Sequence, residues 1–185
     1  RDWSSDVCSS DLILHEYPRC TSKPQPIMAK LEGNYRVVAR TVGARNVGIT
    51  AIEKYSRDAE TLEKALIDEP ENQRYQFYLG QSYFDSQQWE KAIAAYEKRI
   101  QMGGWPEEVY YSMYRIAIAK TNLKHPWPEI MEIFLRAYQY RPIRAEPLFH
   151  IAQVYRTIFN MPAVAYTFAR AAMDIPFPVN DILFV

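Results

Sequence analysis

The sequence contains little glycine, cysteine and histidine, and its charges cancel. Among 185 residues there are 6 Gly, 2 Cys and 3 His, while 22 Lys and Arg balance 22 Asp and Glu. A chain without net charge lacks the general attraction to nucleic acids and anionic membranes. No apolar run approaches the roughly 20 residues that are needed to span a bilayer. We therefore expect no nucleic-acid partner and no membrane span.

The sparse cysteines and histidines also restrict the chemistry. Cys8 lies in the first twelve residues, which are set aside below, and Cys20 alone cannot form an internal disulfide. A chain without disulfides fits a reducing compartment, so we expect a cytoplasmic location. The sequence shows no Gly-rich phosphate loop, no Cys or His pair at metal spacing and no Ser-centred nucleophile elbow. We expect no catalytic residue and no cofactor or metal within this stretch of chain.

Residues 1–12 read unlike the rest of the chain. They run RDWSSDVCSSDL, with neither a helical nor a strand period and without the basic start and apolar core of a signal peptide. The stretch resembles the translation of a sequencing-library adapter that was read into a gene. We expect residues 1–12 to be non-native and the native N-terminal part to be missing. The alternative is a natural Ser/Asp-rich disordered tail.

From residue 58 onward, one pattern repeats along the chain. A large apolar residue is followed three positions later by Ala or a substitute, and five positions after that by a helix-breaking residue. The copies are spaced by 34, 38 and 34 residues, and a fixed period in this range marks a solenoid whose units bury their faces against neighbours. The four copies are Leu62, Ala65 and Pro70; Tyr96, Arg99 and Gly104; Phe134, Ala137 and Pro142; and Phe168, Ala171 and Pro176.

Further offsets within each unit agree, such as Gly80, Tyr83 and Ala92 in one unit and Ala152, Tyr155 and Val164 in another. Over residues 58–176 these spacings resemble the tetratricopeptide repeat. We therefore predict an all-α, tetratricopeptide-type solenoid of helical hairpins over residues 54–176, and the start of a truncated further repeat at 177–185. The seven expected helices cover 54–69, 73–86, 89–102, 106–121, 128–140, 145–158 and 162–173. In the middle unit Tyr114 and Ala117 exchange the large and small positions, which conserves core volume.

The residues before the repeat have a different character. Residues 13–17 and 35–40 are β-prone and are separated by a Pro-containing stretch. Two short strands cannot form an independent domain. We therefore interpret residues 13–50 as a short β remnant, the end of a larger domain.

Several segments together carry a second resemblance. They are LHEY (14–17), GNY (33–35), GAR (43–45), KYSRDAETLE (54–63), YQFYLGQSY (75–83), MGGW (102–105), YQYRPIRAEP (138–147), IP (175–176) and DILFV (181–185). They are similar to bacterial glycosyltransferases that join a nucleotide-sugar-binding catalytic domain to C-terminal tetratricopeptide repeats. The resemblance implies a parent enzyme that uses a nucleotide-sugar donor and a divalent metal, whose acidic motif lies upstream.

In that parent, the solenoid would support the catalytic domain, position the acceptor or mediate homodimerisation, and the fragment alone would be inactive. The competing interpretation is a stand-alone adaptor that binds protein or peptide partners. His15 and Glu16 are the residues that the resemblance would place near the diphosphate or metal. The alternative for His15 is a strand-end side chain that is hydrogen-bonded to backbone.

The repeat also predicts a groove along the first helices of the units. One offset carries Phe77, Tyr111 and Phe149, and the offset four residues later carries Gln81, Arg115 and Gln153. Residues i and i+4 share a helical face, so an aromatic row should run beside a polar row, which Arg74 and Arg156 extend. Such a groove would hold an extended acidic or polar segment. Alternatively, the aromatic rings pack between helices and the arginines are solvated.

Overall fold

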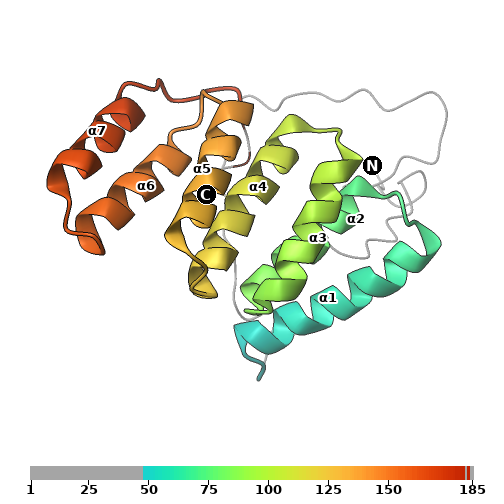
Figure 1. Ribbon diagram of the computed structural model, residues 1–185. Helices are drawn as coiled ribbons and strands as arrows, with labels where there is room; N and C mark the ends of the chain where they lie inside the picture. Colours follow the sequence, from blue (N-terminus) through green and yellow to red (C-terminus); the bar gives the residue numbers. More distant parts are fainter. Residues whose placement is uncertain (1–47, 182, 184–185) are drawn as a thin grey trace, which may run out of the picture.

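The computed structural model describes residues 48–181 and 183, and within this part the chain forms seven α-helices and no strand. Each helix packs against the next one along the chain, and the row runs from α1 to α7 (Figure 1). Helices α2 to α7 form three hairpins, and α1 packs on α2. The helices are α1 (Ala51–Asp68), α2 (Gln73–Asp85), α3 (Trp89–Met102), α4 (Pro106–Asn122), α5 (Trp127–Tyr140), α6 (Glu146–Thr157) and α7 (Pro162–Met173).

The expected solenoid is confirmed, and its helix boundaries lie within three residues of the prediction. The largest difference is at α1, which begins at Ala51 rather than at residue 54. Thr50 caps this end, because its Oγ1 accepts from the Glu53 backbone N–H at 3.2 Å and its own N–H donates to the Glu53 carboxylate at 2.7 Å. This reciprocal pair is a capping box, which satisfies donors that the first turn leaves open.

The turn inside each hairpin contains one residue in the left-handed region of backbone space. These residues are Gln87, Lys124 and Asn160, with φ angles of 61°, 58° and 50°. The left-handed region costs an ordinary residue roughly 1 kcal/mol, and here it lets the chain reverse just after a helix ends. The three units therefore share their turn geometry as well as their side-chain pattern.

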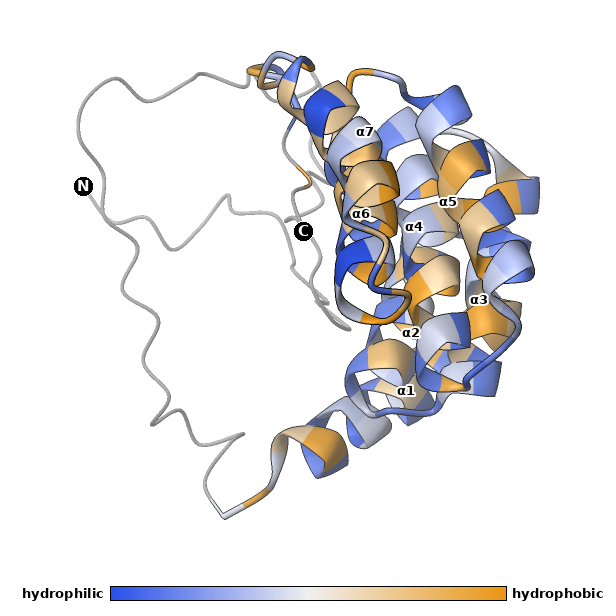
Figure 2. Cartoon of the chain, turned by 60° about the vertical axis from the view of Figure 1, so that its left-hand side comes forward, coloured by the Kyte–Doolittle hydropathy of each residue, from blue (hydrophilic) through white to orange (hydrophobic). Residues whose placement is uncertain are grey.

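Three of the four large residues of the repeat are buried in the core, and the fourth, Phe168, is half-buried. Leu62 and Tyr96 are 0% exposed and Phe134 is 1% exposed. Figure 2 shows hydrophobic and hydrophilic residues alternating around the helices, as expected where one face of each helix is buried. A Cβ atom at Gly80 would lie 2.7 Å from ring carbons of Tyr96, so the absence of a side chain there lets α3 approach α2.

The middle hairpin solves the same packing problem differently. Tyr114 stands at the position of Gly80 and its ring lies 5.8 Å from that of Phe134, while Ala117 fills the position of Tyr83. Tyr114 and Ala117 are 1% and 0% exposed. The exchange of large and small residues therefore leaves both positions buried.

Two tryptophans mark different hairpins. Trp89 at the start of α3 lies edge-on to Phe84 of α2, with 5.0 Å between ring centroids. Trp127 at the start of α5 packs against Tyr155 of α6 at 5.8 Å and against Phe159 at 6.0 Å. Trp127 therefore joins the second hairpin to the third.

The flanks of the solenoid are described in part. Of the expected β remnant at 13–50, residues 48–50 are described and contain no strand, and the two β-prone segments lie outside the described residues. After α7 the chain turns back toward α4, where the Leu183 backbone N–H donates to Glu107 (Figure 1). The described residues of 177–183 contain no helix, so the further repeat expected there remains a prediction.

Candidate functional site

The predicted aromatic row is buried over two of its three helices. Phe77 of α2 and Tyr111 of α4 are 1% and 4% exposed, and their rings meet edge-on with 5.6 Å between centroids. These two rings pack between helices, which is the alternative raised for the groove. They do not present free faces to a ligand.

The polar row next to them is also engaged within the protein. Arg115 places its guanidinium 4.4 Å from the centre of the Phe84 ring and 4.9 Å from that of Tyr111, and it donates to the Tyr111 hydroxyl. Such cation–π contacts stabilise the guanidinium, and they are stronger where the arginine is partly shielded from water. Gln81, at the equivalent position of α2, is half-buried.

The third part of the predicted groove is open. Phe149 of α6 is 58% exposed, and Gln153 and Arg156 on the same helix are exposed as well. These three residues line a cavity of about 310 Å³ between α6 and α7. The structure thus divides the predicted groove into a packed part on α2 and α4 and an open part on α6. Whether any of it binds a ligand remains a prediction.

A buried ion-pair network lies where α3 meets α4. Arg99 is 0% exposed, and its Nε and Nη2 donate to Glu108 Oε2 at 3.1 Å and 2.8 Å. The other carboxylate oxygen of Glu108 accepts from Arg74 Nη1 at 2.6 Å. Arg99 also donates to the Gly103 carbonyl, so it ties the end of α3 to the start of α4. Arg74, expected in the groove, therefore belongs to an ion pair.

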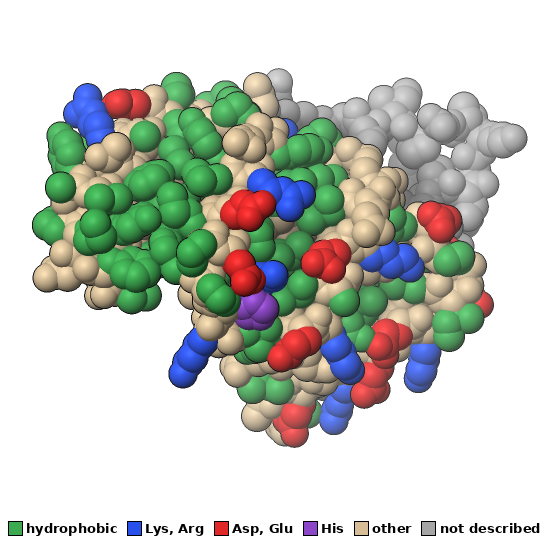
Figure 3. Space-filling view, viewed as in Figure 1, with side chains coloured by type: hydrophobic (Ala, Val, Ile, Leu, Met, Phe, Trp, Pro, Cys, Tyr) green, Lys and Arg blue, Asp and Glu red, His purple; other side chains and the backbone are tan. Residues whose placement is uncertain are grey.

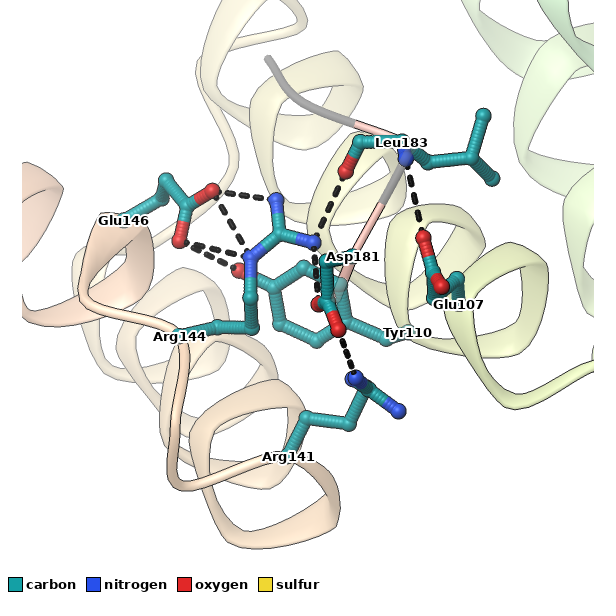
Figure 4. A network of polar contacts seen from close by, with 7 residues as sticks. All are labelled: Glu107, Tyr110, Arg141, Arg144, Glu146, Asp181 and Leu183. Carbon is teal, nitrogen blue, oxygen red and sulfur yellow. Dashed lines mark hydrogen bonds and ion pairs between the residues drawn. The ribbon is translucent and has the colours of Figure 1, made fainter. Parts of the chain in front are cut away.

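A second network lies one unit further on, where the loop before α6 meets α4 (Figure 4). Arg144 is 0% exposed, and its Nε donates to the Glu146 carboxylate at 2.9 Å and 3.1 Å. Its guanidinium lies 4.7 Å from the centre of the Tyr110 ring. The Tyr110 hydroxyl donates to Glu146 at 3.2 Å, which closes the network around Arg144.

This second network holds the segment that follows α7. Asp181 lies between two arginines: Arg141 Nη2 donates to one carboxylate oxygen at 2.5 Å and Arg144 Nη1 to the other at 3.1 Å. The backbone of Leu183 is bound as well, since its carbonyl accepts from Arg144 at 2.8 Å and its N–H donates to Glu107 at 2.8 Å. The site therefore binds both an acidic side chain and backbone atoms of the same segment (Figure 4).

The electrostatics of this site favour charged partners. Burial alone would raise the pKa of Glu146, but hydrogen bonds from Arg144 outweigh it and hold the pKa below its ordinary value. Burial likewise opposes the charge of Arg144, yet the hydrogen bond with Glu146 raises its pKa. Both groups are charged at neutral pH, so the arginine remains a strong donor to a carboxylate.

Sequence reasoning did not find these networks, although it left a signal for each. Glu108 and Glu146 occupy the same position in successive units, and Arg99 stands where the other three copies of the pattern have Ala. Arg141, Arg144 and Glu146 lie within residues 138–147, a stretch that carries the family resemblance but by itself indicates no site. An arginine in a small-residue position should prompt a search for a buried acidic partner.

The remaining predicted site residues, His15 and Glu16, lie outside the described residues. Within the described part of the chain, no group of three or more His, Cys, Asp and Glu residues is arranged to hold a metal ion. The groups that do converge there are arginines, carboxylates and backbone atoms. This arrangement suits the binding of a polypeptide segment.

Comparison with solved structures identifies the same architecture. No family model matches the chain, and no curated protein matches it. The structure designated MamA MSR-1 C2 aligns with a TM-score of 0.53 and 22% identity over 65% of this chain and 67% of that one. MamA AMB-1 C2221 aligns with a TM-score of 0.51 and 23% identity over 65% and 68% of the two chains. Both are tetratricopeptide-like helical proteins. The fold is a tetratricopeptide-type solenoid.

Sequence identities of 22% and 23% show a shared fold and do not show a shared function. None of the described helices has the length and apolar character required to cross a membrane.

Proposed function

We propose that this solenoid is a protein-binding scaffold that holds an extended acidic segment at the start of α4. The observation that carries the proposal is the binding of Asp181 by Arg141 and Arg144, together with the backbone contacts of Leu183. Charge-assisted hydrogen bonds are roughly twice as strong as neutral ones, and main-chain contacts fix the direction of a peptide. The bound segment belongs to the same chain.

A peptide-competition experiment tests this site. A labelled peptide of residues 176–185 should bind the intact chain weakly, since the chain's own segment occupies the site at a high effective concentration. In the Asp181→Asn variant the internal carboxylate loses its charge, so the peptide should bind at least about tenfold more tightly. Fluorescence anisotropy measures both affinities.

Two arginine variants in the Asp181→Asn background serve as a test of the site and its matched control. Arg141→Gln should weaken peptide binding by about tenfold, because it removes one charge-assisted contact. Arg170→Gln, which breaks an exposed ion pair with Asp174 on α7, should leave the affinity unchanged. Equal peptide binding by the intact chain and the Asp181→Asn variant would contradict the proposal.

We further propose that the scaffold belongs to a nucleotide-sugar-dependent glycosyltransferase that transfers a sugar in the cytoplasm with a divalent metal. Support comes from the similar segments in the sequence, one of which, residues 138–147, supplies Arg141, Arg144 and Glu146. In that enzyme the scaffold would dock the catalytic domain, position the acceptor or hold a homodimer together. His15 and Glu16 would then lie near the diphosphate.

The gene upstream of codon 13 distinguishes this proposal from a stand-alone adaptor. In an adapter-free read, an open frame with an Asp-x-Asp-like motif supports the enzyme, whereas a start codon at that point supports the adaptor. In the full-length enzyme, His15→Ala should reduce sugar transfer. Unchanged transfer would remove His15 from the site.

A further inference from the structure

Two phenylalanines at equivalent positions of the solenoid have opposite surroundings. Phe77 of α2 is 1% exposed, whereas Phe149, at the same place in α6, is 58% exposed. Phe77 is covered because α4 lies on α2 and brings Tyr111 to 5.6 Å from it. No described element takes the corresponding place on α6 and α7 (Figure 1).

The open place is a groove of about 310 Å³ between α6 and α7, called the α6–α7 groove below. Its floor is made of small residues and its rims carry two exposed rings, Phe149 and Tyr166, the latter 69% exposed. A floor of small residues lets another helix approach closely. The groove is lined by Phe149, Ala152 and Arg156 of α6 and by Ala165, Tyr166 and Ala169 of α7, among others.

The surrounding surface is apolar as well. Ile158 and Met173 are 67% and 77% exposed. Figure 3 shows hydrophobic side chains gathered over α6 and α7, while most charged ones lie over the middle and the other end of the solenoid. An exposed apolar patch rimmed by polar residues commonly marks an interaction site. A concave groove with raised rims complements the convex surface of a helix. It complements a second copy of the chain less well, because a two-fold axis would place one concave groove opposite another.

The charge of Arg156 indicates which kind of helix would fit the groove. In the packed part of the solenoid, Arg115 of α4 lies 4.4 Å from the ring of Phe84 in α2. The residue of α6 at the position of Phe84 is Arg156, the charged residue among those that line the groove. A helix that packs on α6 as α4 packs on α2 would therefore place its residue equivalent to Arg115 next to Arg156. An acidic side chain is favoured there.

We propose that the α6–α7 groove docks an amphipathic helix of a partner protein, which lies on α6 and α7 as α4 lies on α2 and α3. This helix carries an aromatic or large apolar residue that covers Phe149, and an acidic residue four positions later that pairs with Arg156. The interface continues the one that α4 makes with α2 and α3. It goes beyond the segment-binding site at Arg144 and uses none of that site's residues.

A pair of labelled peptides tests the proposal by fluorescence anisotropy. Both contain residues 105–122, and one carries Arg115→Glu. The acidic peptide should bind the intact chain in a saturable manner and about fivefold more tightly than the native-sequence peptide, because an opposite charge replaces a like charge beside Arg156. Arg156→Glu in the protein should reverse this preference.

Two further variants locate the binding. Phe149→Asp should weaken the acidic peptide by about tenfold or more, since a charge replaces the ring at the contact. Because Phe149 is already exposed, circular dichroism should show an unchanged fold. Ile67→Asp, at an even more exposed apolar residue of α1, should leave binding unchanged. So should Arg141→Gln, which separates this groove from the segment-binding site.

Three outcomes would overturn the proposal. The first is absence of binding by either peptide. The second is binding that neither Phe149→Asp nor Arg156→Glu alters. The third is a dimer of the intact chain, seen by light scattering, that Phe149→Asp dissolves, since a second copy would then occupy the groove.

Discussion

Gly80 determines how closely the first hairpin closes. A Cβ atom at this position would meet the ring of Tyr96 at 2.7 Å, so Gly80→Ala must push α2 and α3 apart or displace the ring. Overpacking of this kind costs about 1–3 kcal/mol, which exceeds the roughly 1 kcal/mol that Ala gains in helix propensity. We expect a net loss of unfolding free energy in urea titrations. Adding Tyr96→Leu, which makes room, should recover part of the loss, and a strictly additive double variant would contradict this account.

Arg99 illustrates the cost of separating a buried ion pair. Arg99 and Glu108 are 0% and 2% exposed, and Arg74 alone would remain to face the carboxylate after Arg99→Ala. Breaking one partner of a buried pair costs about 3–5 kcal/mol. Urea unfolding should show a loss of this size. The double variant Arg99→Met with Glu108→Met should be less destabilised than Arg99→Ala, because it leaves no buried charge without its main partner. Equal losses would argue against the pair.

His150 should give the fold a pH-dependent stability. Burial lowers the pKa of His150, with Glu146 opposing the shift. Its ring stacks on Phe134 at 5.5 Å. The folded state therefore binds a proton less readily than the unfolded state, whose histidine pKa is about 6.5. This contribution to stability is complete above pH 6.5 and is lost as the pH falls through the lower folded-state pKa.

The measurement compares urea midpoints at pH 7.5 and 5.5. The intact chain should lose more stability between these values than the His150→Phe variant, which keeps a ring in the stack but does not titrate. Glu146 should contribute little in this window, because its pKa is lowered and its own loss begins at more acidic pH. Identical losses in both proteins would exclude His150 as the titrating group.

Among individual residues, the sequence predicts the buried core better than it predicts the ion-pair networks. The large residues Tyr96 and Phe134 and the exchanged pair Tyr114 and Ala117 could be read from periodicity, since repeated spacing implies a shared face. The partnership of Arg99 with Glu108 could not, because an arginine at a small-residue position is compatible with either solvent or a buried carboxylate. Contacts across units decide between them.

Among the elements, α1 shows how a local signal sets a boundary. Its Thr50 cap moves the helix start to Ala51, and the sequence already contained the spacing of a capping box. Thr50→Ala should cost about 1 kcal/mol and increase amide exchange in the first turn of α1. Thr61→Ala in the same helix is the matched control. Its hydroxyl bonds the Arg57 carbonyl at 2.9 Å, a bond that stabilises helices little, so this change should be neutral or slightly stabilising. An equal effect of both changes would count against the cap.

The other helix boundaries were predictable to within a few residues for a similar reason. Pro106 and Pro162 each stand at the first position of a helix, where the missing N–H costs nothing. The left-handed residues Gln87, Lys124 and Asn160 were not predicted, since none is glycine. Their conformation is set by the packing of the helices on either side.

For the whole molecule, the repeat period was sufficient to predict a solenoid, because each unit can bury its face only against its neighbours. The return of the chain from α7 to α4 was not predictable in this way. Asp181 and Leu183 meet residues that lie 37 to 76 positions earlier, and no periodic signal links such distant sites. The segment-binding site therefore emerged from the structure, while the open groove on α6 was partly visible in the sequence.

Two tryptophans can serve as fluorescence probes for different parts of the solenoid. Of its four tryptophans, Trp89 reports the first complete hairpin and Trp127 the joint with the last one. Repeat arrays unfold locally where neighbours are fewest, and α7 has an exposed apolar face. Replacing the other three tryptophans with phenylalanine should leave a Trp127 emission that shifts to longer wavelength at lower urea than that of a Trp89-only variant. Coincident shifts would mean that the whole row of helices melts as one unit.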